Sequence, residues 1–201
     1  MGQFLRIAAF ASHGGSNLQS LIDACQAGRI DGEIVAVISN NRKAFALERA
    51  ATAGIKALHL SEKQFDSREE YVAAITRELS ARDVNLICLA GYMKFLPKEI
   101  IEFVHGHVLN IHPALLPKYG GEGMYGIHVH EAVLAAGDKE TGVTVHLVDQ
   151  LYDHGRILAQ TRVPVEPGDT PESLQKRVLK SEHQFYPEVV ARIARGEIIL
   201  E

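Results

Sequence analysis

The alternation of apolar and amphipathic segments is the feature of this chain that most restricts its fold. Most of the short apolar runs, of which Phe4–Ser12 is the first, precede a segment whose apolar residues recur at helical spacing. In the first such segment the residues at i, i+3, i+4 and i+7 are Leu18, Leu21, Ile22 and Cys25. This spacing is typical of an amphipathic helix. Strands that alternate with helices predict an α/β fold with a mostly parallel central sheet and helices on both faces.

Turn residues and helix caps set the expected boundaries. The expected strands are Phe4–Ser12, Glu33–Ser39, Ile55–Leu60, Val84–Ala90, Val108–His112, Thr141–Val148 and Arg156–Val165. The expected helices include Phe45–Ala53, Val129–Ala136 and Pro171–Ala194. Asp66 is expected to cap a further helix, with Glu69 as its capping-box partner. Pro97 suits the first position of the next helix, and Thr170 is expected to cap the last one.

Size and charge narrow the class of protein. A chain of 201 residues, 46% hydrophobic and 23% charged, predicts one globular domain over residues 1–201. The formal charge of −4 offers no large cationic surface, so we expect no nucleic-acid partner. No run approaches the ~20 apolar residues of a membrane span, and no secretory leader precedes the first strand. We therefore expect a cytoplasmic protein without a membrane partner, in which Cys25 and Cys88 stay reduced.

The fold class also predicts where a ligand binds. In open α/β sheets, ligands bind beyond the carboxyl ends of the strands. Four loops should meet at that edge: His13–Asn17, Gly91–Leu96, His112–Gly126 and Asp149–Gly155.

The first of these loops follows a strand and opens a helix. Its sequence, Ser12-His13-Gly14-Gly15-Ser16-Asn17, combines glycines with the free N–H groups of a helix start, which suits a phosphate. It is neither the dinucleotide pattern GxGxxG nor a Walker loop. The alternative is a simple strand-to-helix turn in which Ser16 or Asn17 caps the helix.

The segment Leu109–Pro117 holds the strongest candidate for catalysis. Asn110 and His112 stand two apart in an apolar run, so on a strand they face the same side. An imidazole beside an amide can handle an oxyanion and a proton at one carbonyl. Asp153 would raise the pKa of His112 if the two met, although a loop aspartate is more often only a turn residue. His128, His130 and His146 have no matching carboxylate or cysteine set, so we expect no metal site.

Nearly the whole chain resembles one family, the folate-dependent phosphoribosylglycinamide formyltransferases. The matching motifs are Gly15–Gln19, Phe65–Glu69, Leu89–Met93, Leu109–Pro113, Leu115–Pro117, Gly142 to His146, Asp153-x-Gly155, Ile157–Gln160, Glu182-His183 and Tyr186-Pro187. The resemblance implies a three-layer Rossmann-like formyltransferase fold. It also implies transfer of the formyl group of 10-formyltetrahydrofolate, as co-substrate and without a metal, to the amine of 5-phosphoribosylglycinamide in de novo purine (IMP) synthesis. The products would be formylglycinamide ribonucleotide and tetrahydrofolate.

The resemblance also implies site residues. Protonated His112 and Asn110 would stabilise the oxyanion, and Asp153 would keep His112 charged and order a water that shuttles the proton. The implied ribonucleotide ligands, mostly in the N-terminal part, are Gly15, Ser16, Asn17 and Glu182. The implied folate ligands are Arg68, Met93, Lys94, Phe95, Leu96, Asn110, Asp149, Gln150, Leu151, Tyr152 and Asp153. The partners would be these small molecules, and the protein a monomer or a homodimer.

Two positions and one insertion depart from the common family pattern. His13 and His154 stand where glycines are usual, and about five residues are inserted within Gly120–Tyr125. Other functions remain open: a methionyl-tRNA formyltransferase would need a C-terminal RNA-binding extension, and a formyltetrahydrofolate hydrolase an N-terminal regulatory domain. A sugar-nucleotide formyltransferase is a third enzyme alternative. In a nucleotide-binding or flavodoxin-like module without catalysis, the three candidate catalytic residues would be coincidental.

Overall fold

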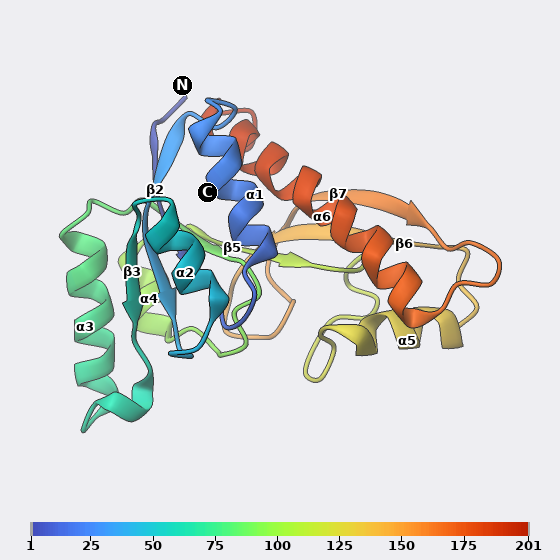
Figure 1. Cartoon of the computed structure of the whole chain (residues 1–201), viewed down its shortest axis with the longest axis horizontal. Helices are drawn as coiled ribbons and strands as arrows, with labels where there is room; N and C mark the ends of the chain where they lie inside the picture. The colour runs from blue at the N-terminus through green and yellow to red at the C-terminus, as the bar shows by residue number, and fades with distance from the viewer. Residues whose placement is uncertain (1, 201) are drawn as a thin grey trace.

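The computed structural model describes residues 2–200 and shows a sheet with helices on both faces (Figure 1). The strands are β1 Leu5–Phe10, β2 Gly32–Ser39, β3 Lys56–His59, β4 Leu86–Leu89, β5 Val108–His112, β6 Glu140–Leu147 and β7 Ile157–Pro164. The helices are α1 Ser16–Gln26, α2 Phe45–Thr52, α3 Arg68–Ser80, α4 Lys98–Phe103, α5 Ile127–Ala135 and α6 Pro171–Ala194, with a 3₁₀ turn at Glu62–Gln64. The α/β prediction is therefore confirmed.

One seven-stranded sheet runs in the order β3-β2-β1-β4-β5-β6-β7. The strands from β3 to β5 pair in parallel, whereas β6 pairs antiparallel with both β5 and β7. The parallel strands end at one edge, where β1, β4 and β5 lie side by side. The mostly parallel sheet that the sequence predicted is thus confirmed, and its antiparallel extension places β6 directly beside β5.

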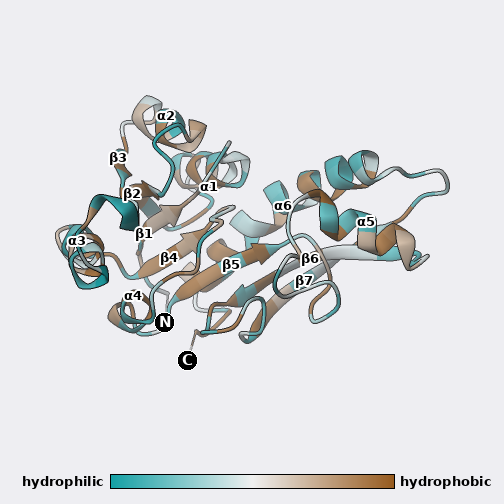
Figure 2. Ribbon diagram, turned by 90° about the horizontal axis from the view of Figure 1, so that it is seen from below, coloured by the Kyte–Doolittle hydropathy of each residue, from teal (hydrophilic) through white to brown (hydrophobic). Residues whose placement is uncertain are grey.

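Both faces of the sheet are covered because successive strand residues point to opposite sides. On β1, Ile7 and Ala9 join the apolar core beneath α1, α2, α5 and α6, while Ala8 and Phe10 join the core beneath α3 and α4. The central strands β1, β4 and β5 are accordingly mostly brown in Figure 2, whereas the helices mix teal and brown residues. The continuous apolar runs that predicted strands are those of a sheet buried on both sides.

Two predicted helix starts are each wrong by one residue. Ser67, not Asp66, caps α3: its Oγ accepts from the Glu70 N–H at 3.1 Å, while the Glu70 carboxylate accepts from the Asp66 N–H at 3.2 Å. The acidic residue that bonds back to the start of the helix is therefore Glu70 rather than Glu69, and it reaches the residue before the cap. Pro97 has extended backbone and precedes the first turn of α4 instead of lying in it. Thr170 caps α6 as predicted, accepting from the Ser173 N–H at 3.3 Å.

Candidate active site

Two neighbouring strands, β5 and β6, bring Asn110 together with His146, which the sequence analysis considered only as a metal ligand and as part of a family motif. Asn110 of β5 lies directly opposite His146 of β6 in the antiparallel register. Side chains of directly opposed residues are close enough to interact. The Asn110 Nδ2 atom lies 3.1 Å from Nε2 of His146. His146 could not be recognised from spacing alone, because the antiparallel pairing of β5 with β6 is not encoded in either strand by itself.

Asp153 reaches the same place from the loop between β6 and β7. Its backbone has a φ of 54°, a left-handed conformation that side-chain-bearing residues seldom adopt. Its carboxylate lies 3.3 Å from Asn110 Nδ2 and 3.5 Å from Nδ1 of His112, and Oδ2 accepts from the Gly121 N–H at 3.1 Å. The three residues that the family resemblance implies as catalytic therefore meet in one cluster.

The hydrogen bonds of the two histidines define which nitrogens carry protons. Nε2 of His112 lies 2.7 Å from the Tyr119 carbonyl, and Nδ1 of His146 lies 2.8 Å from the Leu147 carbonyl. A carbonyl oxygen only accepts, so both of these nitrogens carry a hydrogen. In neutral His112 the lone pair is therefore on Nδ1, which faces Asp153. In neutral His146 the lone pair is on Nε2, which accepts from Asn110.

Burial and the Asp153 carboxylate act on the pKa of His112 in opposite directions. Burial, with only 4% of His112 exposed, lowers its pKa below the ordinary value of 6.5. The Asp153 carboxylate and the Tyr119 carbonyl each raise the pKa of His112, and the charge that His146 can carry lowers it, but burial outweighs the sum. Asp153 thus favours the protonated imidazole, as expected, while burial opposes it; the role of Asp153 in keeping His112 charged stays a prediction.

Asp153 itself stays ionised. Burial raises the pKa of its carboxyl, but contacts with His146, His112 and the Gly121 N–H together hold the pKa below its usual range. A buried carboxylate held in this way stabilises positive charge on the neighbouring imidazole.

The loop after β1 is held from behind by α2. The His13 carbonyl accepts from the Ala46 N–H at 3.0 Å, and the Gly14 carbonyl accepts from Nε of Arg49 at 2.8 Å. In a trans peptide the N–H points opposite to the C=O. The N–H groups of Gly14 and Gly15 therefore point away from α2, and neither donates to another residue among positions 2–200. Outward N–H groups at a helix start form an anion-binding surface.

Gly15 caps α1 in a left-handed conformation, with a φ of 67°. The cap predicted in the alternative interpretation, Ser16 or Asn17, is therefore wrong: both lie inside the helix. The buried Nδ2 of Asn17 donates to Glu182 at 2.5 Å, while Oδ1 of Asn17 has no partner among the described residues. Burial raises the pKa of Glu182, an effect that the Asn17 bond partly opposes. The loop and Glu182, distant in sequence, are thus in direct contact.

The loop after β4 and the loop between β6 and β7, two more of the four predicted loops, also make contacts at this edge of the sheet. The Met93 N–H donates to Oγ of Ser12 at 2.8 Å, which ties the loop after β4 to the loop after β1. The rings of Phe95 and Tyr152 pack edge to face at 5.3 Å, which joins Met93–Leu96 to the segment 149–153. Among the exposed apolar side chains are Met93, Phe95, Leu151 and Tyr152, an unusual concentration on two adjoining loops.

Two remaining positions lie apart from these contacts. Arg68, at the start of α3, has its nearest charged partner in Glu99 at 3.8 Å. His154, at the position that is usually glycine, bonds to Asp149 at 2.8 Å and so stiffens the loop that carries Asp153. Sequence reasoning missed Arg49, the Tyr119 carbonyl and the pairing of His146 with Asn110, because each acts through a contact between distant segments.

Residues 2–200 contain no group of three or more histidines, cysteines or acidic residues placed to hold a metal ion. Within the same range, none of the helices has the length and apolarity required to cross a bilayer.

Comparison with known proteins agrees with this geometry. The family model described as formyl transferase matches residues 5–190. The chain is 40% identical over 194 residues to phosphoribosylglycinamide formyltransferase of Escherichia coli, covering 96% of this chain and 89% of that protein. It is 45% identical to the trifunctional purine biosynthetic protein adenosine-3 of Drosophila melanogaster, where it covers 97% of this chain but only 14% of that protein.

A solved structure extends the comparison to three dimensions. Glycinamide ribonucleotide transformylase 1 of Symbiobacterium toebii superposes with a TM-score of 0.91 at 40% identity, covering all of this chain and 92% of that one. Fold and sequence thus both match formyl transferases. The chain belongs to the formyl transferase family and, within it, to the phosphoribosylglycinamide formyltransferases.

Proposed function

We propose that this protein transfers a formyl group from 10-formyltetrahydrofolate to the amine of 5-phosphoribosylglycinamide, a step of purine biosynthesis. The observation that carries the proposal is the meeting of Asn110, His112 and Asp153 at the end of β5. The relatives named for this activity, with their high identity, supply the substrates. The two substrates would enter from opposite sides of this cluster.

The ribonucleotide is assigned to the side of α1. The outward N–H groups of the loop before α1 suit its phosphate. Gly15, Ser16 and Asn17 would contact the phosphate end, and Glu182 would accept from a ribose hydroxyl. The unpartnered Oδ1 of Asn17 is a further acceptor for a substrate hydroxyl or amine.

The folate is assigned to the exposed apolar rim. Met93 to Leu96 and Asp149 to Asp153 would hold the pterin between side chains and loop backbone, since ring systems bind in apolar sites with a few placed polar groups. Arg68 is proposed to face the acidic tail of the folate from the start of α3. Its only charged partner within 4 Å among the described residues is exposed Glu99, so the guanidinium is available to a carboxylate.

The chemistry needs one proton to move. The substrate amine attacks the formyl carbon, a C–N bond forms, and the carbonyl oxygen becomes an oxyanion. Nδ1 of neutral His112 takes the proton that the amine releases, through a water held by Asp153. The oxyanion and Asp153 both favour the imidazolium, because nearby negative charge raises the pKa of His112. The bond to N10 then breaks, and N10 receives that proton.

Asn110 contributes a hydrogen bond to the oxyanion. In the free protein its Nδ2 donors are directed to His146 and Asp153, so one of them turns to the substrate on binding. A single donor aimed at an oxyanion is worth ~3–4 kcal/mol, so Asn110→Ala should lower kcat on the order of a hundredfold or more.

The test follows absorbance when the protein is mixed with 10-formyl-5,8-dideazafolate and glycinamide ribonucleotide. We expect deformylation of the folate analogue only when both substrates are present, and almost none with folded His112→Ala. No deformylation by the folded wild-type protein would refute the proposal. The treatment of residues 1–201 as one domain, the absence of a metal, the cytoplasmic location and the oligomeric state, monomer or homodimer, stay predictions.

A further inference from the structure

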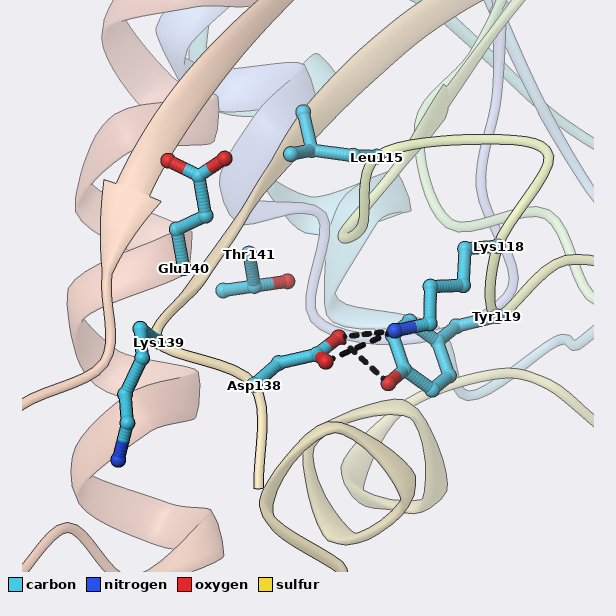
Figure 3. Close-up of a pocket in the computed structure, with 7 residues that line it drawn as sticks. All are labelled: Leu115, Lys118, Tyr119, Asp138, Lys139, Glu140 and Thr141. Atoms are coloured by element: carbon cyan, nitrogen blue, oxygen red, sulfur yellow. Dashed lines mark hydrogen bonds and ion pairs between the residues drawn. The ribbon is translucent and has the colours of Figure 1, made fainter. Parts of the chain in front are cut away.

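Three side chains anchor the segment that carries the Tyr119 carbonyl. Asp138 lies in the turn between α5 and β6, and its carboxylate accepts from the Tyr119 hydroxyl at 2.7 Å. The same carboxylate accepts from the Lys118 ammonium at 2.6 and 2.8 Å. Figure 3 shows both side chains converging on Asp138 at one wall of a cavity of about 270 Å³. We call these three residues the Asp138 cluster.

The Asp138 cluster holds Tyr119 at its ring, while His112 holds it at its backbone. The Tyr119 φ of 60° is left-handed, a conformation that L residues rarely adopt without outside support. On the backbone side, the Tyr119 carbonyl meets Nε2 of His112 at 2.7 Å. Anchoring the Tyr119 ring therefore helps to hold the Tyr119 carbonyl in place. The position of that carbonyl determines that Nε2, and not Nδ1, of His112 is engaged.

The next residue closes the segment onto the catalytic carboxylate. A Cβ atom at Gly120 would lie 2.5 Å from Cδ2 of Leu116 and 3.1 Å from Cβ of Asp153. Only a residue without a side chain lets the backbone approach this closely. Gly121 then donates its N–H to Asp153 at 3.1 Å. The segment from Lys118 to Gly121 thus touches His112 and Asp153 at once.

We propose that Asp138 is a positioning residue for the formyl transfer. It acts through Tyr119, whose carbonyl keeps Nε2 of His112 engaged and leaves Nδ1 as the nitrogen that faces Asp153 and exchanges the proton. This inference rests on the proposed function for its catalytic consequence. Its structural part concerns the free protein, and so can be tested apart from turnover.

The charged groups around His112 give the direction of the effect. Asp153 faces it from the β6–β7 loop, His146 from β6 and His130 from α5. Burial lowers the pKa of His112, whereas Asp153 and the Tyr119 carbonyl raise it and His146 lowers it. If Tyr119 loses its anchor, the carbonyl bond weakens and the imidazolium loses a partner, so the pKa of His112 falls further.

The experiment measures the His112 imidazole by ¹⁵N NMR in the free, full-length protein. In the wild type we expect neutral His112 to be protonated at Nε2. In Asp138→Ala we expect its pKa to fall by about half a pH unit. Tyr119→Phe should act in the same direction, because it removes only the hydroxyl. In Asp138→Asn the pKa of His112 should stay close to the wild-type value, since the amide oxygen still accepts from the Tyr119 hydroxyl.

Kinetics supply the second readout. Asp138→Ala should lower kcat several-fold and move the acid limb of its pH profile to lower pH, with KM for both substrates changed by less than about twofold. The matched control is Lys139→Met, because Lys139 lines the same cavity but points away from the Asp138 cluster in Figure 3. It should titrate and turn over like the wild type.

An unchanged His112 titration in folded Asp138→Ala and Tyr119→Phe would overturn the inference. If Asp138→Ala does not fold, the milder Tyr119→Phe decides. A shifted titration in a protein whose wild type transfers no formyl group would support the positioning role and refute the proposed function, so the two failures are distinguishable.

Discussion

Gly15→Ala tests how tightly the loop before α1 is packed on α2. A Cβ atom at Gly15 would lie 2.8 Å from Cβ and 3.0 Å from Cα of Ala46, closer than real Cβ contacts allow. The φ of 67° adds a left-handed strain of ~1–2 kcal/mol for an L residue. Forcing a methyl group into a packed contact costs a further ~1–3 kcal/mol. The free energy of unfolding should therefore fall by about 2–5 kcal/mol.

Gly28→Ala provides a matched control. Gly28 has nearly the same φ, 68°, but nothing lies within 4 Å of a Cβ atom there. The free energy of unfolding of Gly28→Ala should fall only by the cost of the left-handed conformation, ~1–2 kcal/mol. Urea unfolding measures the difference in stability between the two variants, provided that both unfold with the same m-value. Adding Ala46→Gly to Gly15→Ala should recover part of the loss, because it removes the nearer atom.

The same pair of variants reports on binding. Gly15→Ala should raise KM for the ribonucleotide and leave KM for the folate unchanged, because the N–H groups at the start of α1 move. Gly28→Ala should change neither value. Equal losses of stability in the two alanine variants would refute the argument that contact with Ala46 sets the loop.

Three other predictions follow from the site and its surroundings. Burial lowers the pKa of His130 to about 4 from 6.5, so the unfolded chain takes up a proton first as pH falls. The stability that this provides is complete above pH ~6.5, and about 2.5 kcal/mol of it should be lost by pH ~4.5. Urea unfolding at a series of pH values should show a flatter decline for His130→Gln; the same pH dependence in both proteins would contradict the prediction. Asp153→Asn should lower the pKa of His112, moving the acid limb of the pH–rate profile to lower pH and reducing kcat by about 10²; a slow enzyme with an unmoved limb would argue against this role. Arg49→Met should raise KM for the ribonucleotide roughly tenfold with kcat nearly constant in steady-state assays, because the Gly14 carbonyl loses a charge-assisted bond; a fall in kcat alone would count against it.

The fold was largely predictable because its information is local. Apolar runs buried on both faces and amphipathic helices are visible residue by residue, and the Thr170 cap was read correctly. The errors at Asp66 and Pro97 amount to a single residue each. There, neighbouring residues competed for the same cap, and a backbone angle rather than a residue type decided the outcome.

The site was predictable only in part. Asn110 and His112 could be paired from their spacing on one strand, but nothing local links them to Asp153 or His146. Arg49 became relevant only when α2 was seen to hold the loop before α1. The direction in which the pKa of His112 shifts could not be foreseen, because burial and a carboxylate act on it oppositely and only the structure shows that burial is the larger effect.

The most direct test of the account follows the formyl carbon itself. With a ¹³C-formyl group on 10-formyl-5,8-dideazafolate and with glycinamide ribonucleotide present, mass spectrometry and ¹³C NMR locate the label after complete turnover. The account predicts one labelled formamide on the ribonucleotide for each folate analogue released, with no labelled formate. Label that appears as formate, or release of the folate analogue without the ribonucleotide, would contradict formyl transfer and indicate hydrolysis at the same cluster of Asn110, His112 and Asp153.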